Sequence, residues 1–99
     1  MALDIVWSPE ALNNFHDVLA YLEENWHADV VKDFVSRTEE VIKIISKNPK
    51  IYRKISSRSD VREAIVTKHN LLLYRVHNNQ VTLLSVFDTR QHPKKKRRR

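Results

Sequence analysis

The chemistry open to this sequence depends on cationic and proton-transferring side chains, because the sequence contains no cysteine and no glycine. Without cysteine there is no thiol nucleophile and no thiolate zinc site. Without glycine there is no phosphate-cradling P-loop, dinucleotide fingerprint or nucleophile elbow. The histidines at positions 16, 27, 69, 77 and 92 include no pair at the close spacing that is typical of a helical metal site. We therefore expect neither a metal nor a cofactor.

Two kinds of function remain, which are metal-free acid–base chemistry on a phosphodiester and binding alone. Cleavage of RNA through its own 2′-hydroxyl needs a base, an acid and cations around the phosphorus. The available cations are Arg53, Lys54, Arg62, Lys68, Arg75 and Arg90. The side chains that could move protons are His77, His92, Glu63 and Asp88. Each of them could equally be a solvated strand residue without a role in chemistry.

Arg75 differs from the other cations because it lies inside an apolar strand sequence, Leu-Leu-Leu-Tyr-Arg-Val. An unpaired charge there would be costly, so Arg75 should have a carboxylate partner or lie in a groove. Arg62 lies beside the apolar run Ala64-Ile65-Val66 and raises the same question.

Charge is distributed unevenly along the chain, whose formal net charge is +6. Residues 94–99 are all Lys or Arg and account for that total. Residues 1–47 hold nine acidic and four basic side chains, whereas residues 48–93 hold eight basic and three acidic ones. A fold with an acidic and a basic half can present a cationic face to phosphate or to an acidic protein. Alternatively, the charges only keep two faces solvated.

Two helices are predicted after a short strand at residues 3–7. Ser8 is a favoured N-cap and Pro9 a favoured first helical residue, so the first helix should begin there and end near Trp26. Its predicted apolar stripe consists of Leu12, Phe15, Leu19, Leu22 and Trp26. A second helix should run from Ala28 or Asp29 to the residues before Pro49, packed antiparallel to the first. Its predicted buried face consists of Val31, Phe34, Val35, Thr38, Val41, Ile42 and Ile45.

Strands are predicted at residues 51–55, 61–67, 71–77 and 80–89. Asn78-Asn79 separates the last two, and Asn tolerates the positive φ of a two-residue hairpin turn. That turn predicts four apolar cross-strand pairs, which are Tyr74–Leu83, Val76–Val81, Leu73–Leu84 and Leu71–Val86. Both faces of this hairpin are apolar and helices can cover only one. The other face is therefore either a partner site or buried by a strongly twisted sheet.

These elements predict one α+β domain over residues 1–93, built from a strand, an antiparallel two-helix hairpin and a three- to four-stranded antiparallel sheet. The basic tail, residues 94–99, should be disordered. It could add salt-dependent affinity for DNA or the ribosome, or form only a solvated terminus. No stretch approaches the length of a membrane span and the N-terminus does not look like a signal peptide, so we expect no membrane association and a cytoplasmic protein.

Six local patterns follow one another along residues 4–93. They are Val6-Trp7-Ser8-Pro9-Glu10-Ala11, Val18-Leu19-Ala20-Tyr21-Leu22, Asn48-Pro49, Val61-Arg62-Glu63-Ala64-Ile65, Tyr74-Arg75-Val76 and Val86-Phe87-Asp88-Thr89-Arg90-Gln91-His92-Pro93. In this order they resemble toxins of the RelE/ParE superfamily of bacterial type II toxin–antitoxin systems, although the glycine that many members carry after the Asn-Pro is absent here. The resemblance implies a toxin that a partly disordered cognate antitoxin holds inactive, and with which it could form an oligomer.

The superfamily divides by target, and the resemblance leaves two targets open. RelE-like members cut messenger RNA in the ribosomal A site, whereas ParE-like members poison DNA gyrase without being nucleases. A RelE-like ribonuclease would place Arg62, Arg75 and Arg90 around the phosphate, with His92 or Glu63 for proton transfer.

RelE-like members commonly carry a C-terminal acid–base residue, often Tyr or His, on or near a terminal helix. Here no tyrosine follows Tyr74, and Pro93 disfavours a terminal helix beside His92. With its long helical hairpin and sparse catalytic set, the chain resembles ParE-like members more, which implies gyrase inhibition.

Under the ParE-like interpretation, the candidate target-binding residues are Arg53, Lys54, Arg62, Arg75 and Arg90. A third interpretation is a toxin fold that has lost its activity and survives as a binding module for antitoxin or DNA.

Overall fold

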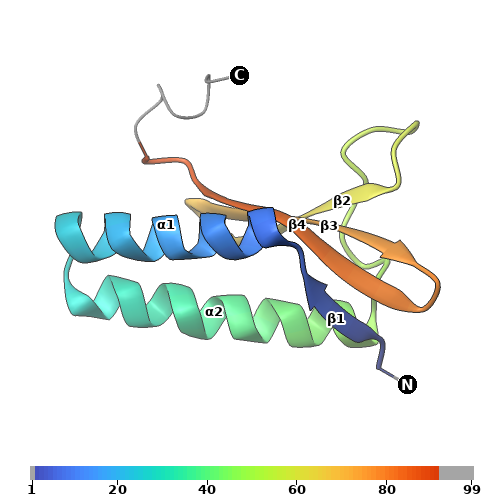
Figure 1. The fold of residues 1–99 in the computed structure, drawn as a ribbon, viewed down its shortest axis with the longest axis horizontal. Coiled ribbons are helices and arrows are strands. Elements are labelled where there is room, and N and C mark those ends of the chain that lie inside the picture. Colours follow the sequence, from blue (N-terminus) through green and yellow to red (C-terminus); the bar gives the residue numbers. More distant parts are fainter. Residues whose placement is uncertain (1, 92–99) are drawn as a thin grey trace.

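The computed structural model describes residues 2–91. Strand β1 (Asp4–Trp7) is followed by helices α1 (Pro9–Asn25) and α2 (Ala28–Lys47) and by strands β2 (Val61–Thr67), β3 (Asn70–His77) and β4 (Gln80–Asp88). The helices run antiparallel beside each other, and β1 lies near the C-terminal end of α2 (Figure 1). The predicted α+β class is confirmed, with its helical hairpin and three antiparallel strands. The predicted tail, residues 94–99, and His92 lie outside the described residues.

Both helices begin and end where the sequence predicts. The Ser8 Oγ accepts a hydrogen bond from the backbone N–H of Ala11 at 3.0 Å, which satisfies a free donor in the first turn of α1. Helix α2 ends at Lys47, directly before Asn48 and Pro49, because Pro cannot continue a helix. The fully buried residues of α2 all belong to its predicted apolar face, and they are Phe34, Thr38, Val41 and Ile45.

The buried face of α1 is rotated slightly from the predicted stripe. Leu12 and Trp26 were predicted in the core, but their side chains are 44% and 45% exposed, so this part of the prediction is wrong. Ala11 and Val18 are fully buried instead. Together with Leu22 they also follow helical spacing, and the small side chain of Ala11 allows the first turn of α1 to lie close to the sheet.

The sheet has the strand order β1-β4-β3-β2. Strand β1 pairs in parallel with β4, from Asp4 opposite Gln80 to Trp7 opposite Leu83, so the complete sheet is mixed rather than antiparallel. The backbone N–H of Leu3 donates to the Ser46 carbonyl at 2.9 Å, and the Ser46 Oγ donates to the Leu3 carbonyl at 3.0 Å. These two bonds fix the start of β1 against α2, which explains why it covers the free edge of β4.

Register in the β3–β4 hairpin follows the prediction only near the turn. Asn78 and Asn79 have φ values of 51° and 60°, as a tight hairpin turn requires. The predicted pairs Tyr74–Leu83 and Val76–Val81 are confirmed. Beyond Tyr74 a β-bulge shifts the register by one residue, so the predicted pairs Leu73–Leu84 and Leu71–Val86 are wrong. The observed pairs are Leu73–Ser85 and Leu71–Phe87.

Contacts with α1 lie at this bulge. The Asn14 side-chain oxygen accepts from the Ser85 Oγ at 3.1 Å and from the Val86 backbone N–H at 3.2 Å. The register shift therefore places Val86 and Asp88 on the buried face, where both have almost no exposed surface.

The strand predicted at residues 51–55 does not form. A single bridge joins Lys54 to Arg62. The backbone N–H of Ile51, which would be a donor in a longer ladder, instead donates to the Asn48 carbonyl at 3.1 Å. The Tyr52 carbonyl accepts from the Arg62 guanidinium at 2.7 Å. The segment between α2 and β2 is consequently a loop that crosses over Arg62.

One face of the sheet packs on the helices and the other does not. The packed face holds the core residues Ala64, Val66, Leu72, Tyr74, Val81, Leu83 and Val86. On the other face Ile65 is 61% exposed, and Leu71 and Leu73 are half-buried. We call these three side chains the open apolar face; the twist of the sheet does not bury them. Within residues 2–91, no helix is long and apolar enough to cross a membrane.

Candidate functional site

Arg62 lies under the loop that follows α2 and is held there by backbone carbonyls. Its Nη1 donates to the Tyr52 carbonyl at 2.7 Å and to the Lys50 carbonyl at 3.4 Å. Within residues 2–91, the ion pairs are Arg37–Glu40, Arg75–Asp60 and Arg90–Asp88, and none includes Arg62. A guanidinium bound only to neutral carbonyls keeps its positive charge available to an anion.

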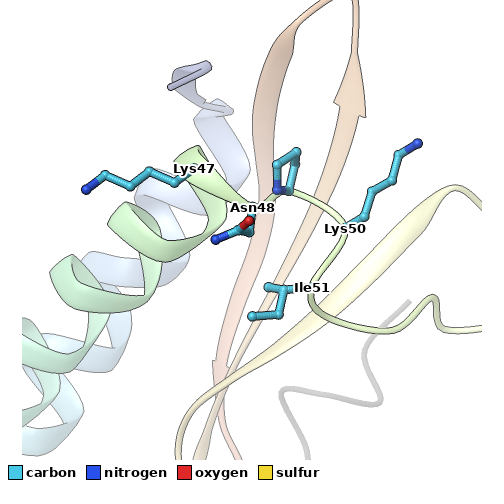
Figure 2. A pocket seen from close by; sticks show the side chains of 5 residues that line it. Lys47, Asn48, Lys50 and Ile51 are labelled. Carbon is cyan, nitrogen blue, oxygen red and sulfur yellow. The ribbon is translucent and has the colours of Figure 1, made fainter. Parts of the chain in front are cut away.

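Arg62 lines a groove of about 810 Å³ between this loop and the β3–β4 turn. We call it the Arg62 groove; its other lining residues are Leu3, Pro49, Lys50, Lys54, Asp60, Val76, His77, Asn78 and Asn79. A second hollow, of about 500 Å³, shares Pro49 and Lys50 with the groove. Figure 2 shows Lys47 and Lys50 extending to opposite sides of the chain where α2 ends, with Asn48 and Ile51 between them. Basic side chains therefore flank two adjoining hollows.

Two contacts of Tyr74 hold the loop in place. Its buried hydroxyl donates to the Pro49 carbonyl at 2.7 Å, and its ring meets that of Tyr52 edge-on at 6.4 Å. Burial raises the pKa of Tyr74, so the phenol stays protonated and continues to donate this bond. The loop residues that contact Arg62 are thus fixed by a core side chain of β3.

Arg75 has the carboxylate partner that the sequence predicts. Its Nε lies 3.1 Å from Oδ1 of Asp60, and both side chains are largely exposed. The hydrogen bond from Arg75 lowers the pKa of Asp60, which keeps this carboxylate ionised. Arg62 pairs with Tyr74 across the strands, so Arg75, the next residue of β3, is directed toward the opposite face of the sheet. Asp60 lines the groove, but Arg75 already neutralises its charge.

Arg90 is bound to a buried carboxylate. Asp88 is fully buried and accepts from the Arg90 Nη2 at 2.7 Å, from its Nε at 3.0 Å and from its backbone N–H at 2.8 Å. The Asn70 side-chain amide donates to the same carboxylate at 2.8 Å. Burial alone would raise the pKa of Asp88, but the hydrogen bonds from Arg90 and Asn70 outweigh it and the net pKa is lowered.

Arg90 also connects the end of β4 to the helical hairpin. Its carbonyl accepts from the Tyr21 hydroxyl at 2.8 Å, and its guanidinium carbon lies 4.8 Å from the centre of the Trp26 ring. The guanidinium is occupied by Asp88 and Trp26 within the folded chain. Arg90 therefore holds the chain after β4 against α1 and does not contribute a free cation.

The structure does not bring the three arginines of the ribonuclease interpretation together. Asp88 pairs with Asn70 and Arg62 with Tyr74, so the two sites lie four residues apart along β3. That separation is roughly 13 Å at about 3.3 Å per residue. Arg75 is on the other face of the sheet from Arg62. In addition, Asp60 binds Arg75 and Asp88 binds Arg90, each at its own position.

The remaining candidate residues divide between the groove and other surfaces. Lys54 and His77 line the groove. Arg53 is exposed and does not line it, and Lys68 is exposed in the β2–β3 turn at the other end of the sheet. Glu63 pairs with Leu73 and shares the side of the open apolar face. His92 lies outside the described residues.

The Arg62 groove can hold an anion but has few groups that could move protons. Of its lining residues within 2–91, only His77 and Asp60 are acid–base candidates at neutral pH, and Asp60 is held ionised by Arg75. Sequence reasoning missed Lys50 and the two turn asparagines. The Asn48-Pro49 helix stop could have indicated them, because it turns the chain back toward the hairpin. In the described part of the chain, no three His, Asp or Glu side chains gather as metal ligands would.

Comparison with protein families supports this fold assignment. The family described as "ParE toxin of type II toxin-antitoxin system, parDE" matches residues 5–93. The chain belongs to the ParE toxin family. A comparison with curated proteins gives no significant match.

Solved structures of this superfamily share the fold at low sequence identity. A chain of the chromosomal ParDE system from P. aeruginosa has a TM-score of 0.72 and 12% identity, over 88% of this chain and 96% of that chain. A chain of the YoeB–YefM complex from Staphylococcus aureus has a TM-score of 0.61 and 22% identity, over 88% and 97%. A mutant of the E. coli toxin RelE in the free state has a TM-score of 0.64 and 15% identity, over 97% and 93%. At these identities the likeness shows the fold alone.

The stability of this ParE-family chain should fall in acid because of Asp88. The carboxylate has a lowered pKa in the folded state, against an ordinary value of 3.8, so the native state binds fewer protons than the unfolded state. Its contribution is complete above about pH 5 and is lost as the pH falls below about 4 toward the folded-state pKa. Asp88→Asn should lower the free energy of unfolding by about 2–3 kcal/mol at pH 7, because Arg90 loses its counter-ion.

Urea unfolding of the wild type and Asp88→Asn between pH 3 and pH 7 measures this difference. It should be large at pH 7 and shrink at pH 3. Asp60→Asn is the matched control, since Asp60 is exposed and its removal should change stability little at any of these pH values. A difference between wild type and Asp88→Asn that does not depend on pH would contradict the role assigned to this carboxylate.

Proposed function

We propose that this chain is a ParE-like toxin that arrests growth by inhibiting DNA gyrase and is neutralised by a cognate antitoxin. One observation carries the choice of target: the three arginines that a ribonuclease would use do not converge. Arg75 and Arg90 are neutralised by Asp60 and Asp88, and only Arg62 keeps an available charge. The match to the ParE toxin family supports the same choice.

The chemistry of the groove favours binding over strand cleavage. In-line attack by a 2′-hydroxyl needs a base, an acid and cations within hydrogen-bond reach of one phosphate. Arg62 and Lys54 could bind a phosphate or an acidic surface, and His77 alone would have to serve for proton transfer at neutral pH. A surface of this kind can hold a target in an inactive state without changing a covalent bond.

Purified gyrase tests the proposal. Added in molar excess over gyrase, the chain should reduce supercoiling of relaxed plasmid or increase cleaved complexes. A type I topoisomerase acting on the supercoiled form of the same plasmid is the control. Its relaxation activity should be unaffected, because a basic protein that merely coats DNA would slow both enzymes. Unchanged gyrase activity would overturn the proposal. Cuts in the ribosomal A site, detected by toeprinting of translating ribosomes, would favour the ribonuclease instead.

We place the antitoxin on the open apolar face, because Ile65, Leu71 and Leu73 form an apolar surface that the helices leave uncovered. Two of the structures with this fold are toxin–antitoxin complexes, YoeB–YefM from Staphylococcus aureus and RelBE2 from Mycobacterium tuberculosis. An apolar segment of the antitoxin that covers this face would bury surface that water now contacts.

Ile65→Asp should therefore increase the amount of antitoxin needed to restore gyrase activity by roughly 10-fold or more, since a charge would be buried against an apolar partner. Leu12→Asp is the matched control, because Leu12 is an exposed leucine on α1. Titration of each toxin variant with antitoxin in the supercoiling assay gives the two values. Equal titration curves for Ile65→Asp and the wild type would show that the antitoxin binds elsewhere.

A further inference from the structure

The Arg62 groove has the features of a preorganised site for an anion. Arg62 is half-buried, and the carbonyls of Tyr52 and Lys50 fix its guanidinium through Nη1. A cation that is oriented in this way loses little further side-chain entropy when an anion binds. Lys50 and Lys54 bring two more positive charges to the same groove.

The one acid in the groove does not cancel these charges. Within residues 2–91, Asp60 is the only carboxylate among the lining residues, and the Arg75 Nε lies 3.1 Å from it. Arg75 comes from the opposite face of the sheet, so it neutralises Asp60 without competing for the groove. The field inside the groove therefore stays positive.

The basic surface is longer than a single carboxylate or phosphate group. The groove adjoins the second hollow through Pro49 and Lys50, and Lys47 extends to the far side of that hollow (Figure 2). The basic side chains that line the two hollows are Lys47, Lys50, Lys54 and Arg62. An extended polyanion fits basic residues spread over two adjoining hollows, because duplex DNA carries one charge for about every 1.7 Å of its axis.

The aromatic side chains favour duplex over single-stranded nucleic acid. Proteins that bind single strands stack the bases on free aromatic rings. The aromatic ring beside this groove belongs to Tyr52, which packs edge-on against Tyr74. Trp26 is exposed, but it lies under Arg90 at the other end of the molecule. Backbone phosphates are therefore a better match to the groove than unstacked bases.

We propose that the Arg62 groove binds the phosphate backbone of duplex DNA, so that the toxin contacts the DNA that gyrase holds as well as the enzyme. The inference rests on the proposed function for its biological setting, because gyrase is the target that presents a DNA duplex. The binding itself needs no gyrase. Arg62, Lys54 and Lys50 contact phosphate oxygens, and no base is read.

Fluorescence anisotropy with a labelled duplex of arbitrary sequence tests the inference on the full chain. Lys54→Gln should weaken binding roughly 5- to 10-fold near 0.1 M salt and lower the slope of log Kd against log salt by about 0.9, the value for one lost phosphate contact. Asp60→Asn should strengthen binding, because it leaves the Arg75 guanidinium without its counter-charge and so adds one net positive charge beside the groove. Lys68→Gln should leave the affinity unchanged, since this exposed lysine lies at the opposite end of the sheet.

The three variants carry the same basic tail, so any contribution from residues 94–99 cancels in the comparison. Equal affinities for Lys54→Gln and Lys68→Gln would overturn the inference, as would unchanged affinity in Asp60→Asn. Displacement of the duplex by polyglutamate at a lower charge concentration than by unlabelled DNA would also overturn it and indicate an acidic protein partner.

The gyrase assay separates this inference from the proposed function. If Lys54→Gln inhibits gyrase as well as the wild type does, the proposed function stands and DNA contact through the groove is not needed for it. If the variants change DNA affinity as expected but the wild type does not inhibit gyrase, the groove binds DNA and the proposed function is wrong.

Discussion

The buried carboxylate of Asp88 is the interaction on which the arrangement of this molecule most depends. It has no exposed surface, so it can remain charged only while Asn70 and both the side chain and backbone of Arg90 donate to it. Arg90 in turn contacts Tyr21 and Trp26 of the helical hairpin. The end of β4, the β2–β3 turn and the tip of the hairpin are thus joined through one ion pair.

The distribution of counter-charges decides what the fold can offer to a partner. Asp88 forms an ion pair with Arg90 and Asp60 forms one with Arg75, whereas Arg62 is bound only by backbone carbonyl oxygens. An arginine that is paired with a carboxylate stabilises the fold, whereas an arginine without a counter-charge can bind an anionic partner. Of three arginines that look alike in the sequence, one lies in a groove with lysines. That distribution supports our proposal of a toxin that binds its target without cutting RNA.

The sequence predicted the features that depend on neighbouring residues. Ser8-Pro9, Asn48-Pro49 and Asn78-Asn79 each place a helix end or a turn through local geometry, and the structure confirms all three. Prediction from the sequence failed where contacts between residues far apart in the chain determine the local structure. The bulge at Leu73 lies where Asn14 contacts β4. It also failed at residues 51–55, where the ladder of the predicted strand stops short of Ile51, whose backbone N–H donates to the Asn48 carbonyl. The sequence predicted that Arg75 has a carboxylate partner, but only the structure shows that this partner is Asp60.

Growth arrest by the expressed chain measures whether Arg62 supplies the positive charge with which the toxin acts on its target. Arg62→Gln is compared with Arg37→Gln, whose guanidinium pairs with Glu40 on the surface of α2. At equal protein levels, we expect arrest by the wild type and by Arg37→Gln, and growth with Arg62→Gln. Full arrest by Arg62→Gln, or harmless expression of the wild type, would show that Arg62 does not have this role.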